Sequence, residues 1–543
     1  MQSSRREADY IAVKLWELFF YCTSFSVLGL ALVQVIFCLT HPMLAQSDQS
    51  MYLSMADLLL RGRVPYVDCF DNNPPLIIYL NVIPVIVASW FKVPISLAFS
   101  LCITALSVSG SLLSLLLCRP LKGRLDGLLV MAAILGYAFF NHGQELDLGQ
   151  REHLFVISML PFLLTRYLRY RDLVPPRWLS IAAGLLAGVG IALKHYFLLI
   201  ALGCEFAWLA RKGSLRILFT GENYACFATI ALYLLHFAFL PKAMVSGYFD
   251  FVVPIYQVGY SYYTNSFVFN VATFWRTDFI YLALVTFVGF VLAPLACDAG
   301  LLLMGLIVFG WLSTSVFVFA GQSWQYHLVP IRMATTAALF VEIAIALILL
   351  ARIPRPRLKR ALMPLLALVP LAPLIDEGEA LYLRLEEEER VQEHFDLGFL
   401  GYKGTCFEYE LSPAVKTILA NTTKDDTVLF ISSGMAPGYP SMIQSERRPA
   451  SRLIHGMLFT VLDYDLSLKK LPERPRFEAY HKQVLDWYVE DIAKNKPVLI
   501  FIQLAPMGDI LNRLHFVDKY MNDYELIGTD YGMQIYRRKG GSR

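Results

Sequence analysis

Long apolar runs recur along the first two-thirds of this sequence, and they limit its fold more than any other feature. Each run of roughly 18 residues or more is long enough to cross about 30 Å of hydrocarbon as a helix. The chain has 543 residues, of which 56% are hydrophobic and only 17% are charged. Soluble domains are usually about 45–50% apolar and about 25% charged. The sequence therefore predicts a polytopic helical membrane protein.

Charge and cysteine content exclude several other classes. The net charge of +3 is too small to favour nucleic acid as a partner. The nine cysteines include no C-x2-C pair, so a zinc-ribbon site is not predicted. Only Cys69 and Cys406 fall in polar segments, which leaves a disulfide between them open. The first apolar run has no small-x-small cleavage site and is interpreted as a retained anchor.

Eleven membrane-spanning helices are predicted from the apolar runs. They cover residues 17–39, 95–118, 127–141, 152–168, 178–193, 196–210, 223–241, 278–296, 299–320, 329–351 and 361–376. Short loops rich in Lys and Arg stay in the cytoplasm. The basic loops "RYLRYRD" (166–172), "RKGSLR" (211–216) and "RIPRPRLKR" (352–360) agree with one another if each helix crosses once. This parity predicts a cytoplasmic N-terminus and an extracytoplasmic C-terminus.

One apolar segment, "PPLIIYLNVIPVIVASWF" (74–91), does not fit this count. If it crossed the membrane, "CRPLKGR" (118–124) would lie outside and every later basic loop would invert. We therefore predict a re-entrant or surface-lying helix on the outer side. The alternative is a full extra span with one misplaced basic loop.

The composition changes after Pro373, where a charged stretch begins. The segments "DTVLFISS" (426–433) and "KPVLIFIQ" (497–504) are typical of buried strands, residues 508–524 of an amphipathic helix, and residues 524–539 of a hairpin. A small α/β domain is predicted over 377–543, after a transmembrane domain over 1–376. This second domain has neither a phosphate loop nor a G-x-S-x-G motif.

Polar side chains near the predicted spans gather on the outer side. They occur in the loop 40–73, at 141–153, in "LKHY" (193–196) and in "GQSWQYHLVPIR" (321–332). Ionisable groups close to hydrocarbon are costly, and they usually face a cavity or one another. Carboxylates can deprotonate an acceptor hydroxyl or hold a divalent metal, and cations can bind phosphate. Together these groups favour a substrate that carries a lipid phosphate.

The segment 46–80, "QSDQSMYLSMADLLLRGRVPYVDCFDNNPPLIIYL", resembles the first extracytoplasmic loop of GT-C-fold glycosyltransferases. This group includes the protein O-mannosyltransferases and the lipid A aminoarabinose transferase. The shared pattern is an acidic residue followed by a polar one and an aromatic, then A-x-x-L/M-x-x-G-x-x-P-Y, then a proline pair that opens a helix. The residues that match it are Asp48-Gln49, Tyr52, Ala56, Leu60-Arg61-Gly62, Pro65-Tyr66 and Pro74-Pro75.

Weaker similarity extends beyond this loop. "LDLGQREHLFVI" (146–157) falls where the family places its second acidic motif, and "GQSWQYHLVP" (321–330) resembles the late loop that closes over the donor. Some relatives carry a lysine just before the prolines, where this sequence has Asp71-Asn72-Asn73. The resemblance implies a GT-C-like all-α membrane domain of about eleven transmembrane helices with outer juxtamembrane helices, followed by the soluble α/β domain.

The resemblance also implies an activity. Such an enzyme moves a monosaccharide from a polyprenyl-phosphate carrier to a hydroxyl of a glycan, glycolipid or protein acceptor, with inversion, at the outer face of a bacterial inner membrane. The resemblance assigns Asp48 as the general base, although an Asp at this position can also be a helix N-cap. The candidates for a second acidic, metal or acceptor site are Asp147, Glu152, Glu145 and Asp71. The candidates for phosphate binding are Arg151, Lys194, His195, His327 and Arg332. The candidates for sugar or acceptor contacts are Gln49, Tyr52, Asn72, Asn73, Trp324 and Tyr326.

Two other functions stay open at this point. One is a transporter or flippase of lipid-linked saccharides, although the sequence shows no internal repeat and its charges lie at the predicted outer boundary. The other is an enzyme like the O-antigen ligases and polymerases, which the first-loop aspartates do not favour. No cofactor is required by the motifs, and a divalent metal stays open. Membrane lipids are expected partners in each case.

Overall fold

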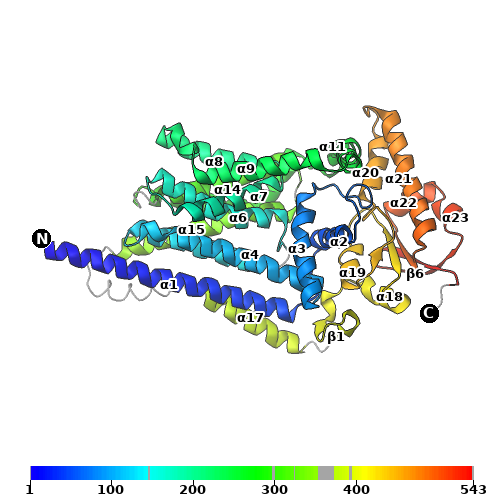
Figure 1. Ribbon diagram of the computed structural model, residues 1–543, viewed down its shortest axis with the longest axis horizontal. Helices are drawn as coiled ribbons and strands as arrows, with labels where there is room; N and C mark the ends of the chain where they lie inside the picture. The colour runs from blue at the N-terminus through cyan, green and yellow to red at the C-terminus, as the bar shows by residue number, and fades with distance from the viewer. Residues whose placement is uncertain are drawn as a thin grey trace. The chain divides into compact units, whose positions relative to one another are not determined.

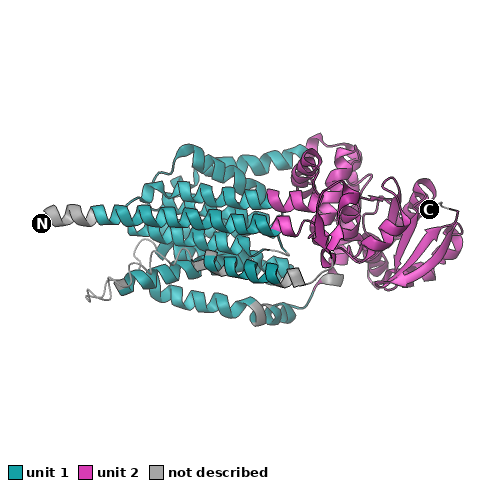
Figure 2. Cartoon of the chain, turned by 90° about the horizontal axis from the view of Figure 1, so that it is seen from below, with its two compact units in different colours: residues 1–37, 103–236, 265–392 teal, residues 38–102, 237–264, 393–543 magenta. Residues whose placement is uncertain are grey.

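A computed structural model of the chain describes residues 2–144, 147–295, 300–322, 324–351, 372–390 and 394–540. The chain divides into two compact units, each built from separate stretches of sequence (Figure 2). Unit 1 comprises residues 1–37, 103–236 and 265–392. Unit 2 comprises residues 38–102, 237–264 and 393–543.

Ten of the eleven predicted spans correspond to observed helices (Figure 1). These are α1 (Gln2–Thr40), α4 (Ile95–Leu117), α5 (Leu125–His142), α6 (Arg151–Tyr170), α7 (Arg177–Ala192), α8 (Phe197–Lys212), α9 (Gly221–His236), α13 (Ile280–Leu292), α14 (Gly300–Ala320) and α15 (Val329–Ala351). The eleventh, 361–376, lies mostly outside the described residues. A further helix, α17 (Ala372–Arg390), contains the predicted domain boundary at 376/377.

Length and composition support the membrane assignment. Among the described residues, five helices are long and apolar enough to cross a membrane: Tyr10–Thr40, Ile95–Leu117, Leu125–His142, Gly300–Ala320 and Gln325–Leu350. Three shorter helices are also apolar: Leu76–Phe91, Arg177–Ala192 and Ile280–Leu292. The predicted class, a polytopic helical membrane protein with a small C-terminal α/β fold, is confirmed.

Close helix packing in unit 1 buries a network of charges. Gly184 on α7 lets α9 approach so closely that a Cβ there would lie 2.2 Å from the carbonyl oxygen of Glu222. Near this contact Arg166, at the C-terminal end of α6, is fully buried. Its guanidinium donates to both carboxylate oxygens of Glu205 and, at 2.9 Å, to Glu222. Arg169 also donates to Glu222, at 3.0 Å. The network therefore holds two cations and two anions.

Unit 2 contains the α/β fold. Its five-stranded sheet has the order β4-β3-β5-β7-β6, with β3 parallel to β4 and β5, and β7 antiparallel to β5 and β6. The strands are β3 (Thr427–Ile431), β4 (Arg448–Pro449), β5 (Leu499–Gln503), β6 (Tyr524–Asp530) and β7 (Met533–Arg538). A separate pair joins β1 (His394–Asp396) to β2 (Thr405–Phe407). Both predicted strands and the predicted hairpin are confirmed.

The predicted helix over 508–524 is wrong in one respect. The structure has two short helices there, α22 (Met507–Arg513) and α23 (Phe516–Tyr520), instead of one. His515 lies between them with a φ of 52°, a left-handed conformation that cannot continue a helix. Cys69 and Cys406 are both free and buried, so the disulfide left open by the sequence is not formed.

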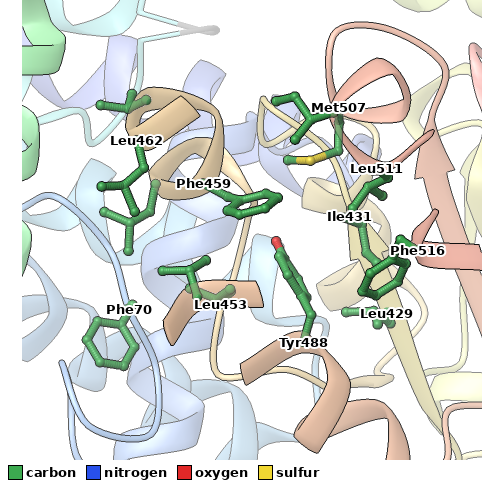
Figure 3. Packing of buried hydrophobic residues seen from close by; sticks show 14 of the residues in the cluster. Phe70, Leu429, Ile431, Leu453, Phe459, Leu462, Tyr488, Met507, Leu511 and Phe516 are labelled. Carbon is green, nitrogen blue, oxygen red and sulfur yellow. The ribbon is translucent and has the colours of Figure 1, made fainter. Parts of the chain in front are cut away.

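The hydrophobic core of unit 2 includes the loop that carries the first-loop motif. Helices α2 (Ser47–Leu60) and α3 (Leu76–Phe91) pack against each other, and the loop between them runs to the C-terminal fold. Phe70 on this loop lies in one core cluster with Leu429 of β3, Phe459 of α20 (Met457–Ser467) and Tyr488 of α21 (Arg474–Asn495) (Figure 3). The backbone N–H of Phe70 also donates to the carbonyl of Arg452 at 2.8 Å.

Helix α20 also carries a buried carboxylate. Asp465 is fully buried, and neither of its carboxylate oxygens has a hydrogen-bond partner among the described residues. It faces α11 (Val253–Tyr263), where a Cβ at Gly259 would lie 3.2 Å from its Oδ1. Burial without a partner raises the pKa of Asp465 to about 7, because the charged form is poorly solvated there.

We expect Asp465→Asn to stabilise the protein at alkaline pH. The folded pKa of about 7 lies above the ordinary value of 3.8, so the wild type is most stable at low pH, loses stability as the pH rises from 3.8 to about 7, and stays at this lower stability above pH 7. The variant lacks this loss and gains up to about 4 kcal/mol in free energy of unfolding at pH 9. Thermal unfolding in detergent between pH 5 and 9 measures this difference in stability between the variant and the wild type. Asp463→Asn, whose carboxylate pairs with Arg513 at the surface, is the control; equal pH slopes for wild type and Asp465→Asn would contradict the prediction.

Candidate functional site

Three helix ends of unit 1 bring together a cluster of polar side chains. Glu152 lies in the first turn of α6, just after the left-handed Gly149. Lys194 and Tyr196 lie in the short break between α7 and α8. His327 lies in the 3-10 turn Gln325–Leu328, directly before α15. The sequence predicted these segments separately, and the structure places their side chains in contact.

The geometry of this cluster centres on one carboxylate oxygen. Lys194 Nζ donates to Glu152 Oε1, and the Tyr196 hydroxyl lies 3.3 Å from the same oxygen. His327 Nε2 lies 3.4 Å from Lys194 Nζ and 3.4 Å from Glu152 Oε1. The His327 Nδ1 lies 3.3 Å from the carbonyl of Gln322, which assigns the proton to Nδ1 and leaves Nε2 as an acceptor for the lysine.

Aromatic rings surround the lysine. The rings of Tyr196 and Tyr326 each lie with their centroids 5.3 Å from Lys194 Nζ, within the range of cation–π attraction. The Trp324 ring is 5.5 Å from the His327 ring. The predicted contact residues Trp324 and Tyr326 therefore belong to this cluster. Tyr196 was not among the predicted residues, although its position two residues after Lys194 was a usable signal.

The cluster is largely removed from solvent. The exposed fractions are 1% for Glu152, 8% for Lys194 and 8% for His327. Glu152 and His327 line a small pocket, together with Tyr196, Ser313 and Phe317. Glu152 Oε2 is buried and has no hydrogen-bond partner among the described residues. A buried charged atom without a partner is costly, which points to a ligand or to a movable side chain.

The other predicted phosphate-binding residues have different positions. Arg151, the first residue of α6, is mostly buried and lies close enough to act electrostatically on Glu152 and His327. His195 is exposed, and its ring makes an edge contact with Tyr196. Arg332 donates to both oxygens of Asp278, at 2.9 and 3.3 Å. Arg151, Lys194 and His327 therefore lie near Glu152 in one cluster, whereas Arg332 forms an ion pair with Asp278.

The predicted residues of the first loop lie in unit 2. Asp48 is in the first turn of α2 and is partly exposed. The N-cap of this helix is Gln46, so Asp48 is not the cap. A carboxylate in the first turn is still stabilised by the helix dipole. Gln49 and Tyr52 are buried, with exposed fractions of 3% and 1%.

The residues just before the proline pair hold the loop in place. Asp71 is buried and lies 3.3 Å from His455 Nε2. It also accepts from the backbone and side chain of Asn73, at 3.0 and 2.8 Å. Burial pushes the pKa of Asp71 upward, but His455 and Asn73 lower it more, so the net shift is downward. Asn72 donates to the Tyr260 hydroxyl at 3.1 Å. His455 had no signal in the sequence.

Two candidates for the second acid have less structural support. Glu145 lies outside the described residues. Asp147 is partly exposed, and its backbone carbonyl accepts from the N–H of Gln150. No group of three or more His, Cys, Asp or Glu side chains in the described part of the chain is close enough together to hold a metal ion.

Comparison with solved structures identifies the fold of the chain. No family model matches the chain, and no curated protein sequence matches it. Among solved structures, ArnT from Cupriavidus metallidurans bound to undecaprenyl phosphate matches at 11% identity with a TM-score of 0.54. The match covers 94% of this chain and 97% of that chain. The chain has the GT-C fold.

A second match has less weight. The archaeal oligosaccharyltransferase AglB from Archaeoglobus fulgidus, in complex with an inhibitory peptide and a dolichol-phosphate, matches at 12% identity over 89% of this chain and 69% of that chain. Its TM-score of 0.34 is too low to support an argument. The GT-C fold predicted from residues 46–80 is therefore confirmed by ArnT, and the roles of individual residues stay predictions.

Proposed function

We propose that this GT-C-fold protein is a glycosyltransferase that uses a sugar carried on a polyprenyl phosphate. The observation that carries the proposal is the buried Lys194, which pairs with Glu152 and lies 3.4 Å from His327, two residues that line a pocket in unit 1. Burying a lysine is expensive unless an anion compensates it. The ArnT structure is bound to undecaprenyl phosphate, and a lipid phosphate is an anion of the required kind.

The proposed reaction moves a monosaccharide to a hydroxyl acceptor on a glycan, glycolipid or protein. The acceptor oxygen attacks the anomeric carbon as Asp48 takes its proton, and the bond from that carbon to the phosphate oxygen breaks with inversion. The electron pair of that bond stays on the departing polyprenyl phosphate. Arg151 and Lys194 stabilise the charge on that phosphate. The position of Asp48 in the first turn of α2 places its carboxylate at the positive end of the helix dipole.

The remaining assignments follow from the same proposal. The N-terminus is proposed to be cytoplasmic and the active side extracytoplasmic, because the positions of the basic loops favour this orientation. The membrane is proposed to be a bacterial inner membrane. Trp324 and Tyr326 are proposed to contact the sugar or the acceptor, and the position of their rings next to Lys194 and His327 supports this role. The test of the function is sugar transfer from a polyprenyl-phosphate sugar by the purified protein, with mass spectrometry of the lipid that co-purifies.

We expect Arg151→Met to weaken binding of undecaprenyl phosphate by about 10- to 100-fold, because a hydrogen bond to a charged group is worth about 1.5–3 kcal/mol. The double variant Lys194→Met/Glu152→Gln removes both charges of the buried pair together, and we expect it to weaken binding similarly. Fluorescence or thermophoresis binding titrations in detergent measure the Kd.

The matched control is Lys212→Met, which removes a cation of unit 1 whose partner is the exposed Asp172. This variant should bind the lipid as the wild type does. Equal Kd values for the wild type, Arg151→Met and the double variant would show that the cluster does not bind the phosphate.

A further inference from the structure

The Lys194–Glu152 pair has an arrangement that a simple structural ion pair does not need. Lys194 Nζ, the Tyr196 hydroxyl and His327 Nε2 all lie at Glu152 Oε1, whereas Oε2 has no partner among the described residues. Both side chains line or adjoin the same pocket, and the carboxylate is buried. Glu152 Oε1 therefore occupies the position at which a phosphate oxygen would bind Lys194.

A phosphate and this carboxylate would compete for the same donor. Besides Glu152, the Lys194 ammonium contacts His327 Nε2, which is a neutral acceptor, and the faces of the Tyr196 and Tyr326 rings. Two anions on one buried cation repel each other strongly where the dielectric constant is low. Arg151 faces the pair as a cation, and the neutral imidazole of His327 and the phenol of Tyr196 also face it. None of them supplies a second anion that could replace Glu152.

We propose that Glu152 is a displaceable counter-ion of Lys194. In the empty site its carboxylate neutralises the lysine, and the phosphate of the lipid takes its place on binding. After transfer the carboxylate returns to Lys194 and drives the polyprenyl-phosphate product out. This inference rests on the proposed function, since it concerns the same phosphate, and it assigns Glu152 to product release rather than to the bond-breaking step.

The test compares Glu152→Gln with the wild type in the full-length protein. Bare undecaprenyl phosphate, the product of the proposed reaction, is the probe. Gln has nearly the same shape but no charge, so we expect the variant to bind the probe at least about tenfold more tightly. We also expect slower steady-state turnover, a lower KM for the lipid-linked donor and stronger inhibition by the probe, while a first turnover proceeds at a near-normal rate.

Thermal unfolding with and without the probe detects a folding defect in this variant. Glu152→Gln leaves Lys194 without its counter-charge, so the empty variant melts at a lower temperature, and the probe should raise its Tm by more than it raises that of the wild type. The control is Glu17→Gln, which removes a carboxylate of α1 that pairs with Lys14 and Lys122, both of which are exposed. It should leave the Kd and the Tm shift unchanged.

The outcomes separate the two proposals. If the wild type binds the probe and Glu152→Gln binds it equally or more weakly, with no larger Tm shift, the displacement is overturned and the proposed function stands. If the wild type does not bind the probe at all, the proposed function fails, and the displacement fails with it. Tighter binding together with slower turnover supports both.

Discussion

Asp48→Asn is expected to abolish sugar transfer while the polyprenyl-phosphate carrier still binds. Asn is nearly isosteric with Asp, and Gln46 rather than Asp48 is the N-cap of α2, so the helix should still form. An amide cannot accept the acceptor proton as a carboxylate does. Loss of a general base typically lowers the rate by about 10²–10⁴-fold.

The measurement is transfer from a polyprenyl-phosphate sugar in detergent, with the Kd for undecaprenyl phosphate and a melting curve for each variant. Asp57→Asn is the matched control, because Asp57 lies on the same helix and its carboxylate pairs with Arg61 at 2.7 Å on a partly exposed face. This control should keep normal turnover. Full activity in Asp48→Asn would remove Asp48 as the base and direct attention to Asp147.

Arg166→Met should cause a large loss of stability without any direct effect on chemistry. The guanidinium is fully buried and bonds Glu205, Glu222 and the carbonyl of Ile217. Removing it leaves Glu205 without this guanidinium and Glu222 with Arg169 alone, and breaking such a buried pair typically costs about 3–5 kcal/mol. The planar fork of arginine matches these acceptors, so Arg166→Lys should recover only part of the loss.

Thermal unfolding in detergent tests this second prediction. Arg119→Met, which removes an exposed arginine of the same unit, is the control and should change the Tm little. A Tm for Arg166→Met close to that of the wild type would show that the carboxylates are stabilised by other groups. The proposed transfer chemistry predicts that the folded fraction of Arg166→Met keeps its specific activity.

Hydropathy was sufficient to predict the membrane-spanning part because a span depends on local composition alone. The buried strands β3 and β5 were found for the same reason, since each is a short continuous apolar run. The charges of "LKHY" also stood out, because Lys194 interrupts an apolar stretch of the sequence. Each of these signals lies within one segment of the chain.

Partners distant in the sequence could not be predicted in this way. Asp71 has the sequence context of a substrate contact, but its carboxylate pairs with His455, 384 residues further along the chain. Arg332 was a candidate phosphate ligand, yet it is bonded to Asp278. A single sequence shows which residues carry a charge, but it does not show which residue of opposite charge each one contacts. The types of residue in the candidate site could therefore be predicted, whereas their ion-pair partners could not.

The interlocked construction of unit 2 has a consequence for biosynthesis. Phe70 and Asp71 leave the ribosome hundreds of residues before Leu453 and His455, with which they pack. At about 5–20 residues per second, this separation corresponds to a wait of roughly 20–80 s. During that interval the loop after α2 lacks the part of its core that the C-terminal fold supplies. We expect a chain that stops before residue 393 to present this loop to chaperones and proteases, so quality control would detect incomplete synthesis at the first loop.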